Sequence, residues 1–232
     1  MKKSLAVLAM SFGVIALAPA ASASVCADNV AYSTYVGGSC TIDGLTFSNF
    51  SFSSSGTTML PASSVTVKVI NGPTFGFEFD TSMSAGIGQT EDILVSFVVT
   101  GAISDLHASF NGSFSGAGTS SDTETYCENG TLLPPAANCS GQNQTLGQLS
   151  LTNPPFNIAP PPVNFLPVLS SIAISKDINV TGGSNVDHPG TATISQITDT
   201  FSTPVPEPMT LSMMGIGLLG LGLMRRRQQG KK

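Results

Sequence analysis

Apolar and polar residues alternate in short runs through most of this chain. Valine occupies every second position of residues 65–69, and phenylalanine does so in residues 75–79. Successive side chains of a β-strand point to opposite faces, so each run predicts a strand with one buried face. Further strands are expected at residues 42–52, 93–100, 172–180 and 191–201. The pattern predicts an all-β fold, and the many short strands favour a single β-sandwich.

The first two runs are expected to form a hairpin. A five-residue loop at residues 70–74 pairs Val69 with Phe75, because this register puts both apolar faces on the same side of the sheet. A three-residue loop is less suitable, since Pro73 cannot take the left-handed conformation required at its last position. In this register Phe77 faces the core and Glu78 faces solvent.

Three other segments bear on the topology. A three-residue loop at residues 111–113 would place Phe110 across from Phe114 in a second hairpin. Residues 93–100 are apolar on both faces, which predicts a central strand. Residues 153–167 are rich in proline, so they are expected to form an edge or a crossing segment between the two halves of the sandwich.

The charge of the chain is unevenly distributed. Residues 24–204 contain thirteen Asp and Glu against two lysines, Lys68 and Lys176, a difference of 2 − 13 = −11, whereas the whole chain carries −5. A body this acidic repels nucleic acid and anionic membrane surfaces. The sequence therefore predicts no nucleic-acid partner.

All four cysteines lie in this acidic body, at Cys26, Cys40, Cys127 and Cys139. An even number favours disulfides in an oxidising compartment. Three pairings are possible, and the local one joins Cys26 to Cys40 and Cys127 to Cys139. No C-x-x-C pair is present, which disfavours a zinc site.

Catalytic groups are sparse. The two histidines, His107 and His188, lie in a strand-like run and in a turn-like run. A triad of Asp187, His188 and a serine would have to assemble in space, and no G-x-S-x-G motif is present. We expect no catalytic residue, and therefore a protein that is not an enzyme.

Carboxylate groups can have two other roles in a chain of this kind. Neighbouring pairs can serve a glycosidase, and three carboxylates near Cys127 can bind calcium. A solvated strand face is the simpler interpretation of the pairs, and the spacing of the three matches no calcium-binding motif. No metal or cofactor is predicted. The residues concerned are Glu78 with Asp80, Glu91 with Asp92, and the group Asp122, Glu124 and Glu128.

The N-terminus has the three parts of a secretory signal peptide. Two lysines at positions 2 and 3 precede an uncharged apolar run at residues 5–18. Ala21 and Ala23 form a small-x-small cleavage site, so signal peptidase is expected to cut before Ser24. Residues 1–23 are predicted to be the signal peptide, and residues 24–204 the exported domain.

The C-terminus, residues 205–232, is equally ordered. A triplet at residues 206–208 is followed by an uncharged run at residues 209–224 and by a basic end at residues 225–232. The run is short for a membrane helix, which needs about 20 residues. We expect it to span the membrane with the basic end in the cytoplasm and the body outside.

This tail resembles the PEP-CTERM sorting signal of Gram-negative bacteria, which is also known as an ice-binding-protein C-terminal domain. The resemblance implies recognition by exosortase, a membrane-embedded cysteine transpeptidase. The second name receives no support from the body, where the T-x-T at residues 191–193 is not part of a tandem repeat. The residues that match the recognition triplet are Pro206, Glu207 and Pro208, and those that match the terminal cluster are Arg225, Arg226 and Arg227.

PEP-CTERM proteins are commonly associated with exopolysaccharide, so the resemblance implies a structural or adhesive protein of that layer. The protein would reside in the inner membrane for a time and then move to the cell surface or the extracellular matrix. The alternatives are a carbohydrate-binding module and a secreted hydrolase. The module needs exposed aromatic side chains, but Trp is absent and only Tyr32, Tyr35 and Tyr126 are available.

Overall fold

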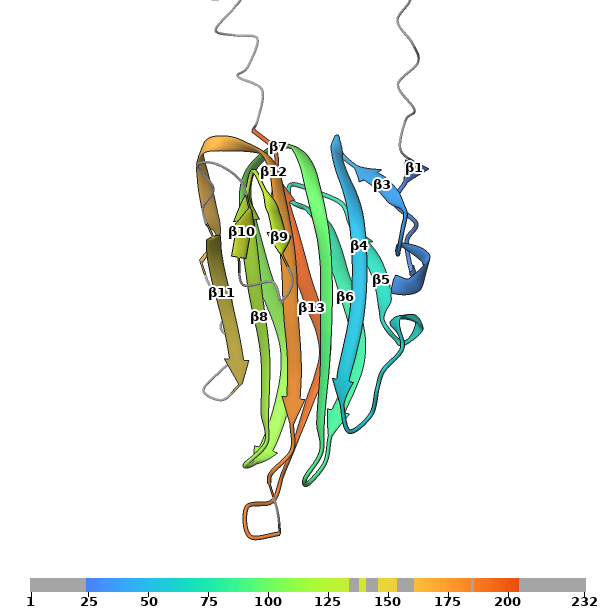
Figure 1. Cartoon of the computed structure of the whole chain (residues 1–232), viewed down its shortest axis with the longest axis vertical. Coiled ribbons are helices and arrows are strands. Elements are labelled where there is room, and N and C mark those ends of the chain that lie inside the picture. The colour runs from blue at the N-terminus through green and yellow to red at the C-terminus, as the bar shows by residue number, and fades with distance from the viewer. Residues whose placement is uncertain (1–23, 134–137, 141–145, 154–160, 185, 205–232) are drawn as a thin grey trace, which may run out of the picture.

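The computed structural model describes residues 24–133, 138–140, 146–153, 161–184 and 186–204 as two layers of β-sheet (Figure 1). The predicted signal peptide, membrane helix and sorting residues lie outside this part of the chain. Within it, no helix is long and apolar enough to cross a membrane. The prediction of an all-β, disulfide-stabilised sandwich is confirmed.

The larger layer, called here the large sheet, consists of seven strands whose ladders are antiparallel except between β1 and β3. In spatial order they are β1 (Ser24–Val25), β3 (Ser39–Ile42), β4 (Leu45–Gly56), the first half of β7 (Thr90–Gly116), β12 (Val163–Thr181), β8 (Thr119–Glu128) and β11 (Leu146–Asn153).

The second layer, the small sheet, is antiparallel throughout. Its order is the second half of β7, β13 (Gly190–Ser202), β6 (Phe75–Ala85), β5 (Thr66–Ile70) and β2 (Val30–Ala31). A separate hairpin pairs β9 (Thr131–Leu133) with β10 (Asn138–Ser140), and two short 3-10 turns are η1 (Tyr32–Thr34) and η2 (Ala62–Ser64).

One long strand, β7, belongs to both sheets. Its residues 91–100 pair with β4, and its residues 105–116 pair with β13. Gly101 lies between the two halves with φ +136°, and a Cβ there would lie 2.5 Å from Leu45. Because only glycine tolerates this conformation and this contact, Gly101 permits the strand to cross from one sheet to the other.

The core between the sheets is rich in aromatic rings. Phe47 of the large sheet lies 4.7 Å from Phe77 of the small sheet between ring centroids, and Phe97 lies 6.1 Å from Phe77. All three side chains are buried. Edge-to-face pairs of this kind add to the free energy gained from burial alone.

The register of the first hairpin differs from the prediction by two residues. Val69 pairs with Phe77 rather than with Phe75, and Ile70 pairs with Gly76, so the five unpaired residues are 71–75. A shift of two keeps every side chain on its predicted face. The buried phenylalanines were therefore assigned correctly although their partners were not.

The run at residues 42–52 is a turn followed by a strand, not one strand. Asp43 and Gly44 both have positive φ values, of 49° and 86°, and connect β3 to β4. Asp-Gly is a preferred two-residue hairpin turn. Farther along β4, a bulge at Asn49 (φ 55°) lets both Phe47 and Phe50 face the core.

The predicted hairpin at residues 111–113 is wrong, because β7 continues through it. Gly112 is required there for close packing: a Cβ would lie 2.8 Å from the Ser120 hydroxyl and 3.0 Å from the Thr193 carbonyl oxygen. The chain turns later, after Gly116 (φ 55°), and enters β8. Residues 93–100 occupy the predicted central position, between β4 and β12.

Both disulfides have the local pairing, Cys26 with Cys40 and Cys127 with Cys139. The first joins the segment after β1 to β3, and the second joins β8 to β10. No free cysteine occurs among the described residues. Each bridge restricts the unfolded chain and stabilises the fold by about 2–4 kcal/mol.

Candidate functional site

The outer face of the large sheet carries ordered rows of small polar side chains. Paired residues of β4, β7, β12 and β8 lie side by side about 4.8 Å apart across the sheet. We call this surface the polar rows. The first row is Ser55, Asp92, Asn179 and Ser121; the second is Ser53, Leu94, Asp177 and Thr123; the third is Ser51, Ser96, Ser175 and Thr125. Leu94 is the apolar exception, and Ser175 is buried, so the first two rows and the Ser51 end of the third form the accessible part.

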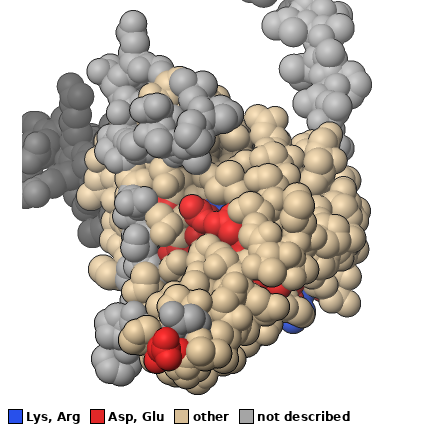
Figure 2. All heavy atoms as spheres, turned by 60° about the horizontal axis from the view of Figure 1, so that its bottom comes forward, with Lys and Arg blue, Asp and Glu red and all other residues tan. Residues whose placement is uncertain are grey.

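The carboxyl groups of Asp92 and Asp177 occupy the middle of the first and second polar rows. Asn179 Nδ2 donates to Asp92 Oδ2 at 3.3 Å, and the Thr181 hydroxyl donates to Asn179 Oδ1 at 3.0 Å. Burial, the charge of Asp92 and a hydrogen bond with Asp92 raise the pKa of Asp177. Figure 2 turns the bottom of the Figure 1 view toward the reader, and it shows acidic side chains on a surface that is otherwise mostly uncharged.

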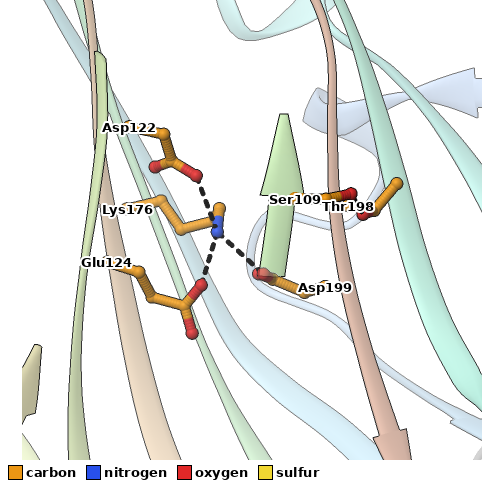
Figure 3. A network of polar contacts seen from close by, with 6 residues as sticks. All are labelled: Ser109, Asp122, Glu124, Lys176, Thr198 and Asp199. Atoms are coloured by element: carbon orange, nitrogen blue, oxygen red, sulfur yellow. Dashed lines mark hydrogen bonds and ion pairs between the residues drawn. The ribbon is translucent and has the colours of Figure 1, made fainter. Parts of the chain in front are cut away.

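A second polar group lies inside the sandwich. Lys176 Nζ lies 2.6 Å from Glu124 Oε2, 2.7 Å from Asp199 Oδ1 and 3.0 Å from Asp122 Oδ2 (Figure 3). All four side chains are fully buried. We call these residues the charge cluster. Three of them belong to the large sheet, and Asp199 reaches them from β13 of the small sheet.

The charge cluster holds one cation against three carboxyl groups, so full ionisation would leave two buried negative charges uncompensated. Burial raises the pKa of Asp122 from 3.8 to about 6, although Lys176 opposes this. Burial and the charge of Glu124 raise the pKa of Asp199 well above its ordinary value. Burial lowers the pKa of Lys176, but the three carboxyl groups outweigh it and raise that pKa overall.

Strand periodicity explains how the charge cluster reaches the core. Lys176 has the same parity as Ile174 and Ile178, and Asp199 has the same parity as Ile197 and Phe201. The inward face of each strand therefore includes one charged side chain among apolar ones. This parity is the sequence signal from which the buried charges could have been predicted.

The carboxylates considered as catalytic pairs have other surroundings. Glu78 and Asp80 both form ion pairs with Lys68, at 3.0 and 2.5 Å, on the outer face of the small sheet. Glu91 is buried and accepts a hydrogen bond from the Ser84 backbone N–H, at 3.0 Å, whereas Asp92 points outward. The second pair is thus split between the two faces of one strand.

Two of the three carboxylates near Cys127 lie together, but around a lysine. Asp122 and Glu124 point into the core, where the ammonium group of Lys176 takes the position of a cation. No group of side chains suited to a metal ion occurs among the residues that the structure describes. His107 lies 3.4 Å from Asp105 Oδ1 on β7, and His188 lies in the connection between β12 and β13.

None of the tyrosines offers an exposed ring for stacking on a sugar. Tyr32, Tyr35 and Tyr126 are all buried. The Tyr32 hydroxyl donates to backbone carbonyl oxygens, at 3.1 Å for Ser51 and 3.0 Å for Ser96. These rings support the core instead.

A family model settles what the C-terminal tail is. It is described as the PEP-CTERM protein-sorting motif, and it matches residues 204–227. The tail of this chain is a PEP-CTERM sorting signal. The predicted resemblance is confirmed for the tail, and no family is assigned to the body. The motif implies an exported protein that is anchored in the membrane before exosortase processes it.

Other comparisons say little about the body. No curated protein matches the chain. One similar solved structure is that of TmCBM61 in complex with beta-1,4-galactotriose, which is 13% identical and has a TM-score of 0.28. The match covers 75% of this chain and 98% of that one. A similarity this low supports no conclusion about ligand or activity.

Proposed function

We propose that this protein is a non-enzymatic component of the bacterial cell surface or extracellular matrix. The observation that carries the proposal is the PEP-CTERM motif at residues 204–227, attached to a disulfide-bonded β-sandwich. Signal peptidase would release the body from residues 1–23, and exosortase would act at the tail. The body would then give structure or adhesion to the exopolysaccharide layer.

The polar rows support contact with a polysaccharide. Hydroxyl, amide and carboxyl groups supply both donors and acceptors, which match the hydroxyl groups of sugars. A pocket beside this face, lined by Asn49, Ser96 and Thr131 among others, has a volume of only about 140 Å³, well below the several hundred Å³ of typical ligand sites. We therefore favour many weak contacts along a chain over one deep site. The acidity of the body favours a neutral polysaccharide.

The sorting step can be tested in a host that has exosortase. We expect cleavage close to residues 206–208, so that the surface fraction lacks the basic end. Glu207→Ala should leave the tail attached and hold the protein in the inner membrane, because the recognition triplet is lost. Intact mass measurement of both fractions checks this. A wild-type surface protein that still carries Arg225, Arg226 and Arg227 would contradict exosortase processing.

The role of the polar rows can be tested in a strain that lacks the gene. We expect the wild-type protein to restore cell aggregation and to remain in the matrix fraction. Ser53→Arg should reduce its retention several-fold, since a bulky charged side chain in the second row prevents close approach of a polysaccharide. Quantitative immunoblots of matrix and medium give the retained share.

Ser113→Arg is the matched control for that variant. Ser113 is also an exposed serine on the outer face of a strand, but it lies on the small sheet, next to Thr193. Retention should stay at the wild-type level. Equal losses for the two variants would show that the polar rows have no special role, and unchanged aggregation on deletion of the gene would refute the adhesive function itself.

A further inference from the structure

Lys176 and Asp199 face each other across the two sheets at a distance from which a covalent bond can form. Lys176 Nζ contacts Asp199 Oδ1 at 2.7 Å, and Glu124 Oε2 lies 2.6 Å from the same nitrogen. We propose that Lys176 and Asp199 become joined by an isopeptide bond, with Glu124 as the base that accepts the lysine proton. This inference rests on the charge cluster alone and holds whether or not the protein acts in a matrix.

Asp199 is the carboxyl group best suited to be attacked. Within the described part of the chain, no amide, hydroxyl or ammonium group donates to its Oδ2. Glu124 and Asp199 both contact the same Lys176 nitrogen, so the two carboxyl groups lie close together inside the sandwich. Burial and the charge of Glu124 raise the pKa of Asp199 well above its ordinary value, which favours its protonated form. A neutral carboxylic acid is the form that an amine can attack.

The reaction is a condensation that needs no oxidant, reductant or other reactant. The lysine ammonium first gives one proton to the Glu124 carboxylate. The free Nζ attacks Cγ of Asp199, the new C–N bond forms, and the C–OH bond breaks. The hydroxyl group leaves as water with a second proton from the nitrogen. The product is a neutral amide, and Glu124 retains the proton that it accepted.

The position of the charge cluster favours this condensation. Fixed neighbours inside a protein react as if present at about 10⁵ M or more. All four side chains are fully buried, so little water is available to reverse the bond. The reaction also neutralises the ammonium group of Lys176 and the carboxylate of Glu124, which removes the cost of keeping those charges out of water.

The bond would tie the two layers of the sandwich together. It would connect β12 of the large sheet with β13, the strand that leads to the sorting motif at residue 204. If exosortase joins the protein to a surface acceptor, a pulling force enters the domain through β13. A covalent link from Asp199 to Lys176 would pass that force directly to the large sheet.

Digestion after lysine provides a sharp test, because the body contains only Lys68 and Lys176. Protein isolated from the exporting host is denatured, reduced and treated with a lysine-specific protease. An amide-bonded Lys176 is not cleaved, so the fragment that begins at residue 69 should continue past residue 176. It should be lighter than its sequence by one water molecule, and fragmentation should place the bond between Lys176 and Asp199. Cleavage of the wild-type chain after Lys176 would overturn the proposal.

Two variants provide the controls. Asp199→Ala removes the electrophile and Glu124→Gln removes the base, so both should be cut after Lys176 and should keep the full sequence mass. If the Asp199→Ala fragment were still lighter by one water molecule, the dehydration would lie at another site, and the proposed bond between Lys176 and Asp199 would be wrong. The wild-type digest decides the matter on its own if either variant fails to fold.

Discussion

Phe77→Asp should lower the free energy of unfolding by about 5 kcal/mol or more, enough to unfold a domain of ordinary stability. Phe77 is fully buried and its ring contacts Phe47 and Phe97 of the opposite sheet. The substitution removes these contacts and places an unpaired carboxyl group among aromatic rings. Urea denaturation or the loss of β-sheet circular dichroism measures the effect.

Glu78→Gln is the matched control for this prediction. It changes the adjacent residue of the same strand, but its side chain lies on the outer face beside Lys68. Lys68 keeps its second partner, Asp80, so only a small shift in the melting temperature is expected. If the two variants melted alike, the assignment of faces in β6 would be wrong.

Lys176→Met should lower the free energy of unfolding by about 3–5 kcal/mol at neutral pH. Methionine keeps much of the shape of lysine but leaves Asp122, Glu124 and Asp199 buried without a cation. The loss is expected whether Lys176 is held by ion pairs or by an amide bond. Equilibrium denaturation at several pH values measures it.

The pH dependence of this variant has a definite sign. Burial already raises the pKa of Asp122 from 3.8 to about 6 in the presence of Lys176. A carboxyl group whose pKa is raised by folding stabilises the native state below its unfolded pKa, and this stability is lost as the pH rises through the folded value. Removing Lys176, which lowers the pKa of Asp122, raises that pKa further, so Lys176→Met should recover stability as the pH falls from neutral toward 4.

A neutralised cluster is the control for Lys176→Met. Combining it with Asp122→Asn, Glu124→Gln and Asp199→Asn removes the unpaired charges while nearly preserving the shape. We expect this combination to regain part of the lost stability and to lose the pH dependence. If Lys176→Met alone were as stable as the wild type at neutral pH, Lys176 would not stabilise the buried carboxyl groups as the charge cluster requires.

The two hairpin predictions show how far local patterns reach. The alternation at residues 65–69 and 75–79 identified the buried faces, because parity is a property of the strand itself. It did not identify that Val69 pairs with Phe77, since a register shift of two preserves every face. At Gly112, a residue typical of turns was needed instead for close contact with Ser120 and Thr193.

Both candidate sites depend on contacts between residues that are distant in the chain. The polar rows form because β4, β7, β12 and β8 are neighbours in the sheet, and no local sequence pattern predicts that order. The local sequence places Asp122 and Glu124 only beside Cys127 and Glu128, because their partner, Lys176, is distant in the chain. Only the pairing of β8 with β12, and the packing of both against β13, brings these side chains to Asp199.

Features that lie in contiguous residues can be recognised without the structure. These are the PEP-CTERM tail, the β-strand alternation and the presence of four cysteines in one body, each of which is recognised by a short-range pattern. The path of β7 through both sheets, the composition of the polar rows and the burial of Lys176 among three carboxyl groups become visible only in the folded chain. These features depend on contacts between residues far apart in the chain, and the free energy of such contacts is set by the whole packed core rather than by any one segment.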